Sequence, residues 1–166
     1  MSALAKLQAA GVTHLTIDSR CAAPHCAFVA LPPATADSRD GRDFVAQALA
    51  AGSPLVCGEG EPPKGVAAEQ WVGLTDVRRG YPPLAAALAG DTVADLRVIG
   101  VTGTDGKTSV TWLASELFNA LEPGTCARLG TLGVQWHGVD EQPGFTTPPA
   151  AVLHPLLARM AAAGQR

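Results

Sequence analysis

Residues 96–121 have the sequence LRVIGVTGTDGKTSVTWLASELFNAL, which gives the clearest indication of the fold class. Its beginning, residues 96–101, is a β-branched apolar run that predicts a buried strand. Residues 108–121 place apolar side chains at helical spacing, which predicts a helix with one buried face. That face consists of Val110, Leu113, Ala114, Leu117, Phe118 and Leu121. A strand followed by a glycine-containing loop and a helix is typical of α/β proteins.

The loop between this strand and this helix suits a nucleotide triphosphate. Its glycines let backbone N–H groups converge on phosphate oxygens, and the amino terminus of the helix adds the positive end of its dipole. Lys107 supplies a mobile positive charge, and Thr108 can ligate a magnesium ion. We therefore predict a cofactor-binding segment made of Gly103, Thr104, Asp105, Gly106, Lys107, Thr108 and Ser109.

Residues 1–92 have the pattern of a small α/β domain. An alternating pattern predicts a strand over residues 12–17, and apolar runs predict strands over residues 26–31, 55–57 and 71–74. Three helices are predicted: one over residues 3–10, one capped by Asp43 and closed by Gly52, and one from Pro82 to Ala89. The polar residues 33–42 predict a surface loop, and residues 90–95 are the predicted linker.

Residues 93–166 form the second predicted domain. After the loop and its helix come a predicted strand over residues 127–134 and a predicted helix over residues 149–163, which Pro155 should kink. A parallel sheet built from such units needs further strands before both of its faces are buried. We therefore expect residues 93–166 to be the incomplete beginning of a P-loop-type ATPase domain with a mainly parallel sheet, truncated, and the chain to be a fragment that is inactive alone.

Composition narrows the class of partner. The formal net charge is −3 and the basic residues are scattered, which argues against a nucleic-acid or anionic-membrane surface and favours a small-molecule partner. No signal peptide and no apolar stretch of about 18 residues is visible, so we expect a cytoplasmic monomer. The spacing of the cysteines does not favour a zinc site and predicts reduced, small core residues: Cys21, Cys26, Cys57 and Cys126.

The phosphate loop differs from the ordinary P-loop, Gly-x-x-x-x-Gly-Lys-Ser/Thr, because Val101 stands where the first glycine belongs. Residues 103–109 instead resemble the shorter Gly-x-x-Gly-Lys-Thr/Ser loop of the Mur ligase and folylpolyglutamate synthetase superfamily. Asp105 departs from that pattern, since the family usually has asparagine there. A carboxylate beside phosphates is repulsive unless it points outward or helps to cap the helix.

Further segments resemble one branch of that superfamily, the UDP-N-acetylmuramoyl-tripeptide synthetases, which add a diamino acid. Residues 18–20 (DSR), 28–32 (FVALP) and 40–44 (DGRDF) are similar to its amino-terminal domain, which holds the uridine end of the acceptor. Residues 130–133 (GTLG) and 146–148 (TTP) are similar to motifs of its central domain. By this resemblance Ser19 would hydrogen-bond the uracil, while Thr146 and Thr147 would hold the acceptor near the γ-phosphate.

The resemblance implies an ATP-dependent ligase of peptidoglycan precursor synthesis. Such an enzyme phosphorylates the carboxylate of UDP-N-acetylmuramoyl-L-alanyl-D-glutamate, and the amine of an amino acid then attacks the acyl phosphate. The implied cofactors are ATP and Mg²⁺, with Lys107 as the catalytic residue and Thr108 as the metal ligand. The family's later magnesium-binding glutamate and its carboxy-terminal domain, which selects the amino acid, are expected to be absent.

Two rival functions stay open at this point. The first is another ligase of the superfamily, such as a folylpolyglutamate or cyanophycin synthetase, against which the amino-terminal motifs weigh. The second is a non-catalytic acceptor-binding module or pseudo-enzyme, which Asp105 favours. Such a module should bind the UDP-linked acceptor and ignore ATP.

Overall fold

The computed structural model describes residues 1–91, 96–142, 144–145 and 147–166. Its contacts divide the chain into two compact units. The first unit comprises Met1–Gly90 with Ala150–Pro155, and the second comprises Asp91–Pro149 with Leu156–Arg166. The predicted domain boundary between residues 92 and 93, and most of the predicted linker, lie outside the described residues.

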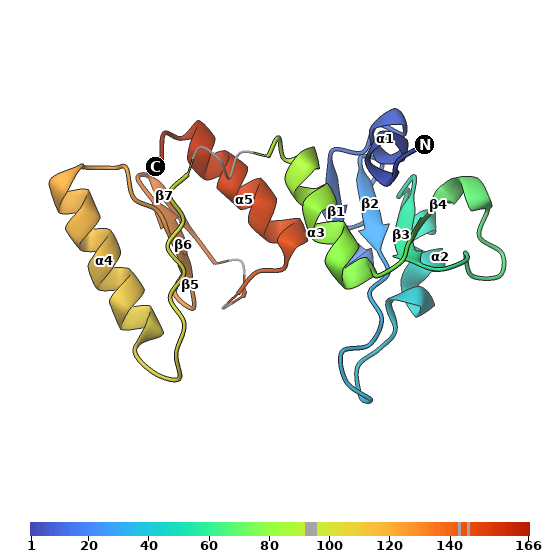
Figure 1. Ribbon diagram of the computed structural model, residues 1–166, viewed down its shortest axis with the longest axis horizontal. Helices are drawn as coiled ribbons and strands as arrows, with labels where there is room; N and C mark the ends of the chain where they lie inside the picture. Colours follow the sequence, from blue (N-terminus) through green and yellow to red (C-terminus); the bar gives the residue numbers. More distant parts are fainter. Residues whose placement is uncertain (92–95, 143, 146) are drawn as a thin grey trace. The chain divides into compact units, whose positions relative to one another are not determined.

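The first unit is built on a parallel four-stranded sheet with the order β1-β2-β3-β4 (Figure 1). Its strands are β1 (His14–Thr16), β2 (Cys26–Val29), β3 (Val56–Glu59) and β4 (Trp71–Leu74). Each of the four strands predicted for residues 1–92 is present, and the α/β class is confirmed. Because all strands are parallel, their carboxyl ends lie along one edge of the sheet, where ligand sites of open α/β sheets concentrate.

Both faces of this sheet are covered, which explains why the central strand β2 is a continuous buried apolar run. One face packs on α1 (Ala3–Ala9) and α3 (Val77–Leu88), with Leu7 and Tyr81 reaching Val29 in one cluster. The other face packs on α2 (Val45–Ala50), where Val45 and Ala48 join Phe28, Val56 and Trp71. Successive residues of β2 alternate between the two clusters, as the pleat of a strand requires.

The start of α2 differs from the prediction, because Asp43 does not cap it. The cap residue of α2 is Phe44, which makes no side-chain capping bond. A short 3₁₀ helix, Gly41–Phe44, comes first, and its cap is Asp40, whose carboxylate accepts a hydrogen bond from the Arg42 N–H at 2.9 Å. The closing role predicted for Gly52 is consistent with its φ of +98°, a conformation that favours glycine.

The predicted start of α3 is wrong as well. The helix begins at Val77, so Pro82 and Pro83 lie inside it rather than in its first turn. Prolines lack an N–H and weaken a helix interior. Two carboxylates compensate at the amino terminus: Asp76 accepts from the Arg79 N–H at 3.0 Å, and Glu59 accepts from the Val77 N–H at 3.0 Å.

We expect Asp76→Ala to lower the free energy of unfolding of the first unit by about 1 kcal/mol, because the cap of a proline-containing helix is removed. The measurement is urea denaturation followed through amide NMR signals of β3 and β4. Asp37→Ala, which removes the same charge from an exposed loop, is the matched control and should change stability by much less. Equal effects of the two variants would contradict the capping role.

The cysteines differ in their surroundings. Cys26 and Cys57 are buried strand residues, and burial raises the pKa of the Cys26 thiol to about 11 and that of Cys57 to about 12. These two thiols therefore behave as small core side chains, as predicted. Cys21 is exposed and Cys126 is half-buried, so the same prediction is wrong for Cys21.

The second unit contains α4 (Lys107–Leu121) and an antiparallel sheet of β5 (Arg128–Gly130), β6 (Gly133–Trp136) and β7 (Val139–Glu141). The last helix, α5 (Ala150–Ala162), is shared between the units. Both helices match the predicted spans closely. Within the described residues, no helix has the length and apolar character needed to cross a membrane.

Two predicted strands of this unit are not found as expected. Residues 96–101 form no strand, because a strand requires a hydrogen-bonded neighbour that the described residues do not provide. Val98 and Ile99 in this segment are exposed. The strand predicted over residues 127–134 is split by a tight turn into β5 and β6. Gly133 makes the turn possible: its φ is +93°, and an added Cβ would lie 2.3 Å from the Glu141 carbonyl oxygen.

The orientation of α4 also contradicts the prediction. Of the six residues of the predicted buried face, Ala114 is half-buried and the other five are exposed, from 45% for Phe118 to 72% for Leu121. The opposite side of the helix, with Ser115 buried, contacts β5. Asn119 fastens this side by bonding both the N–H and the carbonyl oxygen of Cys126, at 3.1 and 3.0 Å. The polar side is used because it satisfies backbone groups, while the described residues supply no second layer for the apolar face.

Candidate functional site

The phosphate loop meets the amino terminus of α4 at Gly106. This glycine has a φ of +75° and is the helix cap, and its carbonyl accepts the first helical hydrogen bond, from the Val110 N–H at 2.9 Å. The N–H groups of Lys107, Thr108 and Ser109 come earlier and have no acceptor inside the helix by its geometry. Three backbone donors and the positive end of a helix therefore meet at one point, which is an anion-binding arrangement.

Lys107 organises the loop. Its Nζ donates to the carbonyl oxygens of Gly103 and Thr104, the second at 3.1 Å, so the loop closes around the ammonium group. Asp105 is exposed, and no side chain caps α4. The Asp105 carboxylate therefore does not cap α4, which is one of the two ways in which it could avoid phosphates. Thr104 and Ser109, the remaining predicted loop residues, are exposed as well.

Thr108 lies beside the second glycine motif. Together with Thr111 it lines a small cleft whose other wall is Arg128 and the turn at residues 129–133. The phosphate loop (residues 103–109) and the second glycine motif (residues 130–133) are distant in sequence, and the fold brings them together at the first turn of α4. Arg128 lines the same cleft, and its Nη1 is buried without a hydrogen-bond partner in the described part of the chain.

The predicted acceptor contacts of the second unit are placed only in part. Thr146 lies outside the described residues. Thr147 is exposed and precedes Pro149, the cap of α5.

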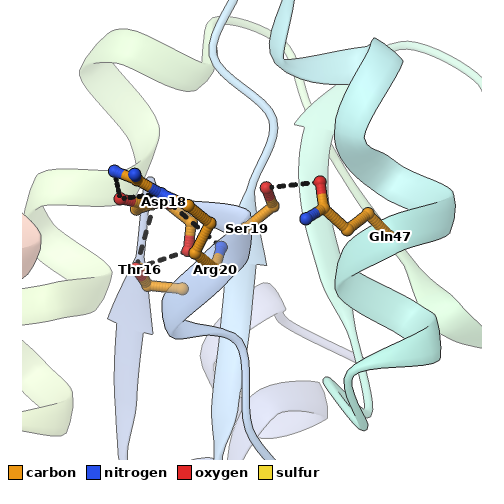
Figure 2. A network of polar contacts seen from close by, with 5 residues as sticks. All are labelled: Thr16, Asp18, Ser19, Arg20 and Gln47. Carbon is orange, nitrogen blue, oxygen red and sulfur yellow. Dashed lines mark hydrogen bonds and ion pairs between the residues drawn. The ribbon is translucent and has the colours of Figure 1, made fainter.

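Ser19 lies in a tight turn directly after β1. The turn is a short 3₁₀ helix, Ser19–Cys21, capped by the Asp18 carboxylate, which accepts from the Arg20 N–H at 3.0 Å. Thr16 adds a second bond, because its Oγ1 accepts from the Asp18 N–H at 3.1 Å. Figure 2 shows that Ser19 points away from this cluster toward α2, where its Oγ donates to Gln47 Oε1 at 3.0 Å. The Asp-Ser-Arg motif therefore builds a rigid turn that presents Ser19 at the carboxyl edge of the sheet.

The ion pair of this turn has a measurable signature. The Arg20 side chain and backbone N–H, both hydrogen-bonded to Asp18, hold the pKa of that carboxyl below its usual value. We expect Arg20→Ala to raise the Asp18 pKa toward the ordinary value, with part of the lowering retained through the backbone bond. A carboxyl carbon NMR titration measures this shift.

The sign of the pH effect follows from the same pKa. Because the folded pKa of Asp18 is lowered, its contribution to stability is present above the unfolded pKa of about 3.9 and is lost as pH falls through the folded value. The pair is exposed, so the contribution is small. Asp37→Ala, which removes an exposed charge, is the control and should leave the Asp18 pKa unchanged. An unchanged Asp18 pKa in Arg20→Ala would contradict the pairing.

A cavity of about 560 Å³ opens at the same edge of the sheet, beyond the ends of β2 and β3. Its lining includes Ala30, Pro32, Asp40, Arg42, Glu59, Gly60, Glu61 and Pro62. Arg42 spans the cavity wall, because its Nη2 donates to the carbonyl oxygens of Glu59 and Glu61 and its guanidinium lies 5.5 Å from the centre of the Trp71 ring.

Gly41 explains why the Asp-Gly-Arg motif has a glycine at its centre. An added Cβ would lie 2.5 Å from the backbone nitrogen of Leu31, so any other residue would push the loop off the end of β2. The motif is visible in the sequence, but the positions of Arg42 and Gln47 beside the candidate site are not predicted by it. Their partners are distant in the chain, and no local spacing signals them.

A parallel α/β unit and a lysine-containing glycine loop at a helix amino terminus define a class of nucleotide-binding α/β proteins. Residues 101–166 match the family model of the Mur ligase middle domain. A UDP-N-acetylmuramoyl-L-alanyl-D-glutamate–2,6-diaminopimelate ligase from Alkalilimnicola ehrlichii is 40% identical over 157 residues, which cover 88% of this chain. A UDP-N-acetylmuramyl-tripeptide synthetase from Deinococcus radiodurans is 36% identical over 92% of it. The chain belongs to the Mur ligase family.

Solved structures agree with this assignment. A UDP-N-acetylmuramoyl-L-alanyl-D-glutamate–2,6-diaminopimelate ligase matches 93% of the chain with a TM-score of 0.73 and 31% identity. A MurF ligase from Thermotoga maritima, solved in complex with ADP, matches with a TM-score of 0.54 and 21% identity, which shows a shared fold. The chain spans about 30% of the length of the ligases that it matches.

Proposed function

We propose that this chain provides the acceptor-binding and ATP-binding parts of a Mur ligase that joins a diamino acid to UDP-N-acetylmuramoyl-L-alanyl-D-glutamate. The observation that carries the proposal is the loop around Lys107, whose ammonium group and helix-terminal N–H groups meet at one anion-binding point. Several relatives that match most of the chain are named as ligases of this acceptor.

The loop residues fit a nucleotide and its metal ion. The backbone N–H groups of residues 107–109 can bind phosphate oxygens, and Lys107 can exchange its two carbonyl partners for a phosphate. The Thr108 hydroxyl, in the first turn of α4, can ligate Mg²⁺. The chemistry that bound ATP supplies is activation of the acceptor carboxylate for attack by an amine. Lys107 would neutralise the phosphate oxygens on which charge develops, and we assign it as the catalytic residue.

We assign the acceptor to residues from both predicted domains. Residues 1–92 are proposed to hold its uridine end, with Ser19 bonding the uracil, and residues 93–166 to hold ATP. Thr146 and Thr147 are proposed to keep the reacting end of the acceptor near the γ-phosphate. The small net charge of −3 and the scattered basic residues support small-molecule partners rather than nucleic acid or a membrane surface. We further propose a cytoplasmic location and, for the complete ligase, a monomer.

Two calorimetric titrations of the 166-residue chain test this proposal. The UDP-linked dipeptide is expected to bind the first unit, and ATP with Mg²⁺ is expected to bind the loop. A chain that binds the UDP-linked dipeptide and ignores ATP would instead be a non-catalytic acceptor-binding module, a function that the exposed Asp105 favours. Binding of neither ligand would refute both functions.

A further inference from the structure

Gln47 lies next to the Ser19 turn, although 28 residues separate the two in sequence. Gln47 projects from α2, is exposed, and accepts the Ser19 hydroxyl proton at 3.0 Å (Figure 2). Ser19 itself is 7% exposed. A ligand that reaches the hydroxyl oxygen must therefore also meet the residues that frame it, and Gln47 is the one that holds its proton.

This hydrogen bond leaves Ser19 as a hydrogen-bond acceptor and Gln47 as a hydrogen-bond donor toward a ligand. The single proton of Ser19 is engaged, so its oxygen has only lone pairs to offer a ligand. The Gln47 carbonyl oxygen is engaged as well, which leaves its Nε2 with N–H groups to donate. An acceptor and a donor thus stand side by side at the carboxyl edge of a parallel sheet.

Such a pair complements one pyrimidine base and opposes the other. Uracil presents an N3–H donor beside a carbonyl acceptor, whereas cytosine presents an N3 acceptor beside an amino donor. We propose that Gln47 is a specificity-determining residue that reads the uracil of the acceptor together with Ser19. This inference rests on the proposed function, in which the uridine end of the acceptor binds at Ser19.

The local structure holds the pair in place before a ligand arrives. Asp18 and Thr16 fix the turn from one side by backbone hydrogen bonds. On the other side, Val45 and Ala48 anchor α2 in the core and so fix the helix from which Gln47 projects. Because the Ser19 and Gln47 side chains are already ordered, they lose little conformational entropy when a ligand binds, which favours selectivity.

The test compares UDP and CDP binding to the 166-residue chain by calorimetry. The wild-type chain is expected to prefer UDP by about tenfold or more, the effect of one mismatched hydrogen bond. Gln47→Glu has the same shape but only accepts, so the ratio of the two affinities should shift toward CDP by about tenfold or more. Gln47→Met keeps the size, loses both amide groups, and should bring the ratio close to one.

Gln8→Glu makes the same charge change at an exposed position of α1 and should leave the ratio unchanged. Using a ratio removes any general repulsion between the new carboxylate and the diphosphate. If the wild-type chain binds neither nucleotide, the proposed function fails at this site. If UDP binds but the Gln47 variants keep the wild-type ratio, or if the wild-type chain prefers CDP, the role of Gln47 is overturned while acceptor binding stands.

Discussion

Lys107→Ala is expected to reduce ligation by at least about a hundredfold, the loss typical of removing one group that stabilises charge in a transition state. Lys107 is the only cationic side chain in residues 100–109. Its ammonium also holds the loop closed through the carbonyl oxygens of Gly103 and Thr104, so the variant loses both the charge and the shape of the loop.

Acceptor-dependent ADP release measures this effect. The suitable protein is a chimaera in which residues 1–166 replace the matching part of the Alkalilimnicola ehrlichii ligase, since the two are 40% identical over 157 residues. The unmodified chimaera must be active for the comparison to count. Lys64→Ala removes an exposed lysine from a loop of the first unit and should leave turnover unchanged. Unchanged turnover in Lys107→Ala would refute the role proposed for the loop.

The second large effect is expected at the apolar face of α4. Val110, Leu113, Leu117 and Leu121 are each more than half exposed, and a contiguous apolar surface of this kind drives association. We expect the 166-residue chain to bind a hydrophobic dye and to self-associate through this face. Leu113→Lys combined with Leu117→Lys should weaken association by at least about tenfold, because each buried leucine is worth about 1.5–3 kcal/mol.

Sedimentation velocity and dye fluorescence measure the association. Glu116→Lys is the matched control: it changes the net charge by the same two units on the same helix but lies outside the apolar face. Helix content should be the same in both variants, since lysine is a good helix former. Association that persists in the double variant would show that another surface carries it.

The boundaries of elements are predictable where the signal is local. Strand β2 appears as an apolar run that is followed by Pro32-Pro33, because burial of both faces leaves no polar position in it. The predicted start of α3 is wrong because Pro82-Pro83 has the composition of a first turn. The stronger local signal is Asp76, a good helix cap, and the second carboxylate, Glu59, is distant in sequence.

Periodicity correctly predicts that residues 107–121 form a helix but not which side of it is covered. Its apolar stripe has the spacing of a buried face, yet the covered side is the one held by Ser115 and Asn119. Likewise the apolar residues 96–101 have strand composition without strand structure. The spacing of apolar residues indicates which face a segment could bury. Whether that face is buried depends on packing against a neighbouring layer.

Residue order alone was enough to predict the α/β class and the family, which are confirmed, and to propose the phosphate loop at residues 103–109 and Ser19 as a candidate contact. All of these depend on residues that are adjacent or regularly spaced along the chain. The folded chain was needed to show that Gln47 stands beside Ser19, that Thr108 shares a cleft with the turn at residues 129–133, and that one face of α4 is exposed. Each of these features depends on how distant parts of the chain pack, and no local pattern encodes such packing.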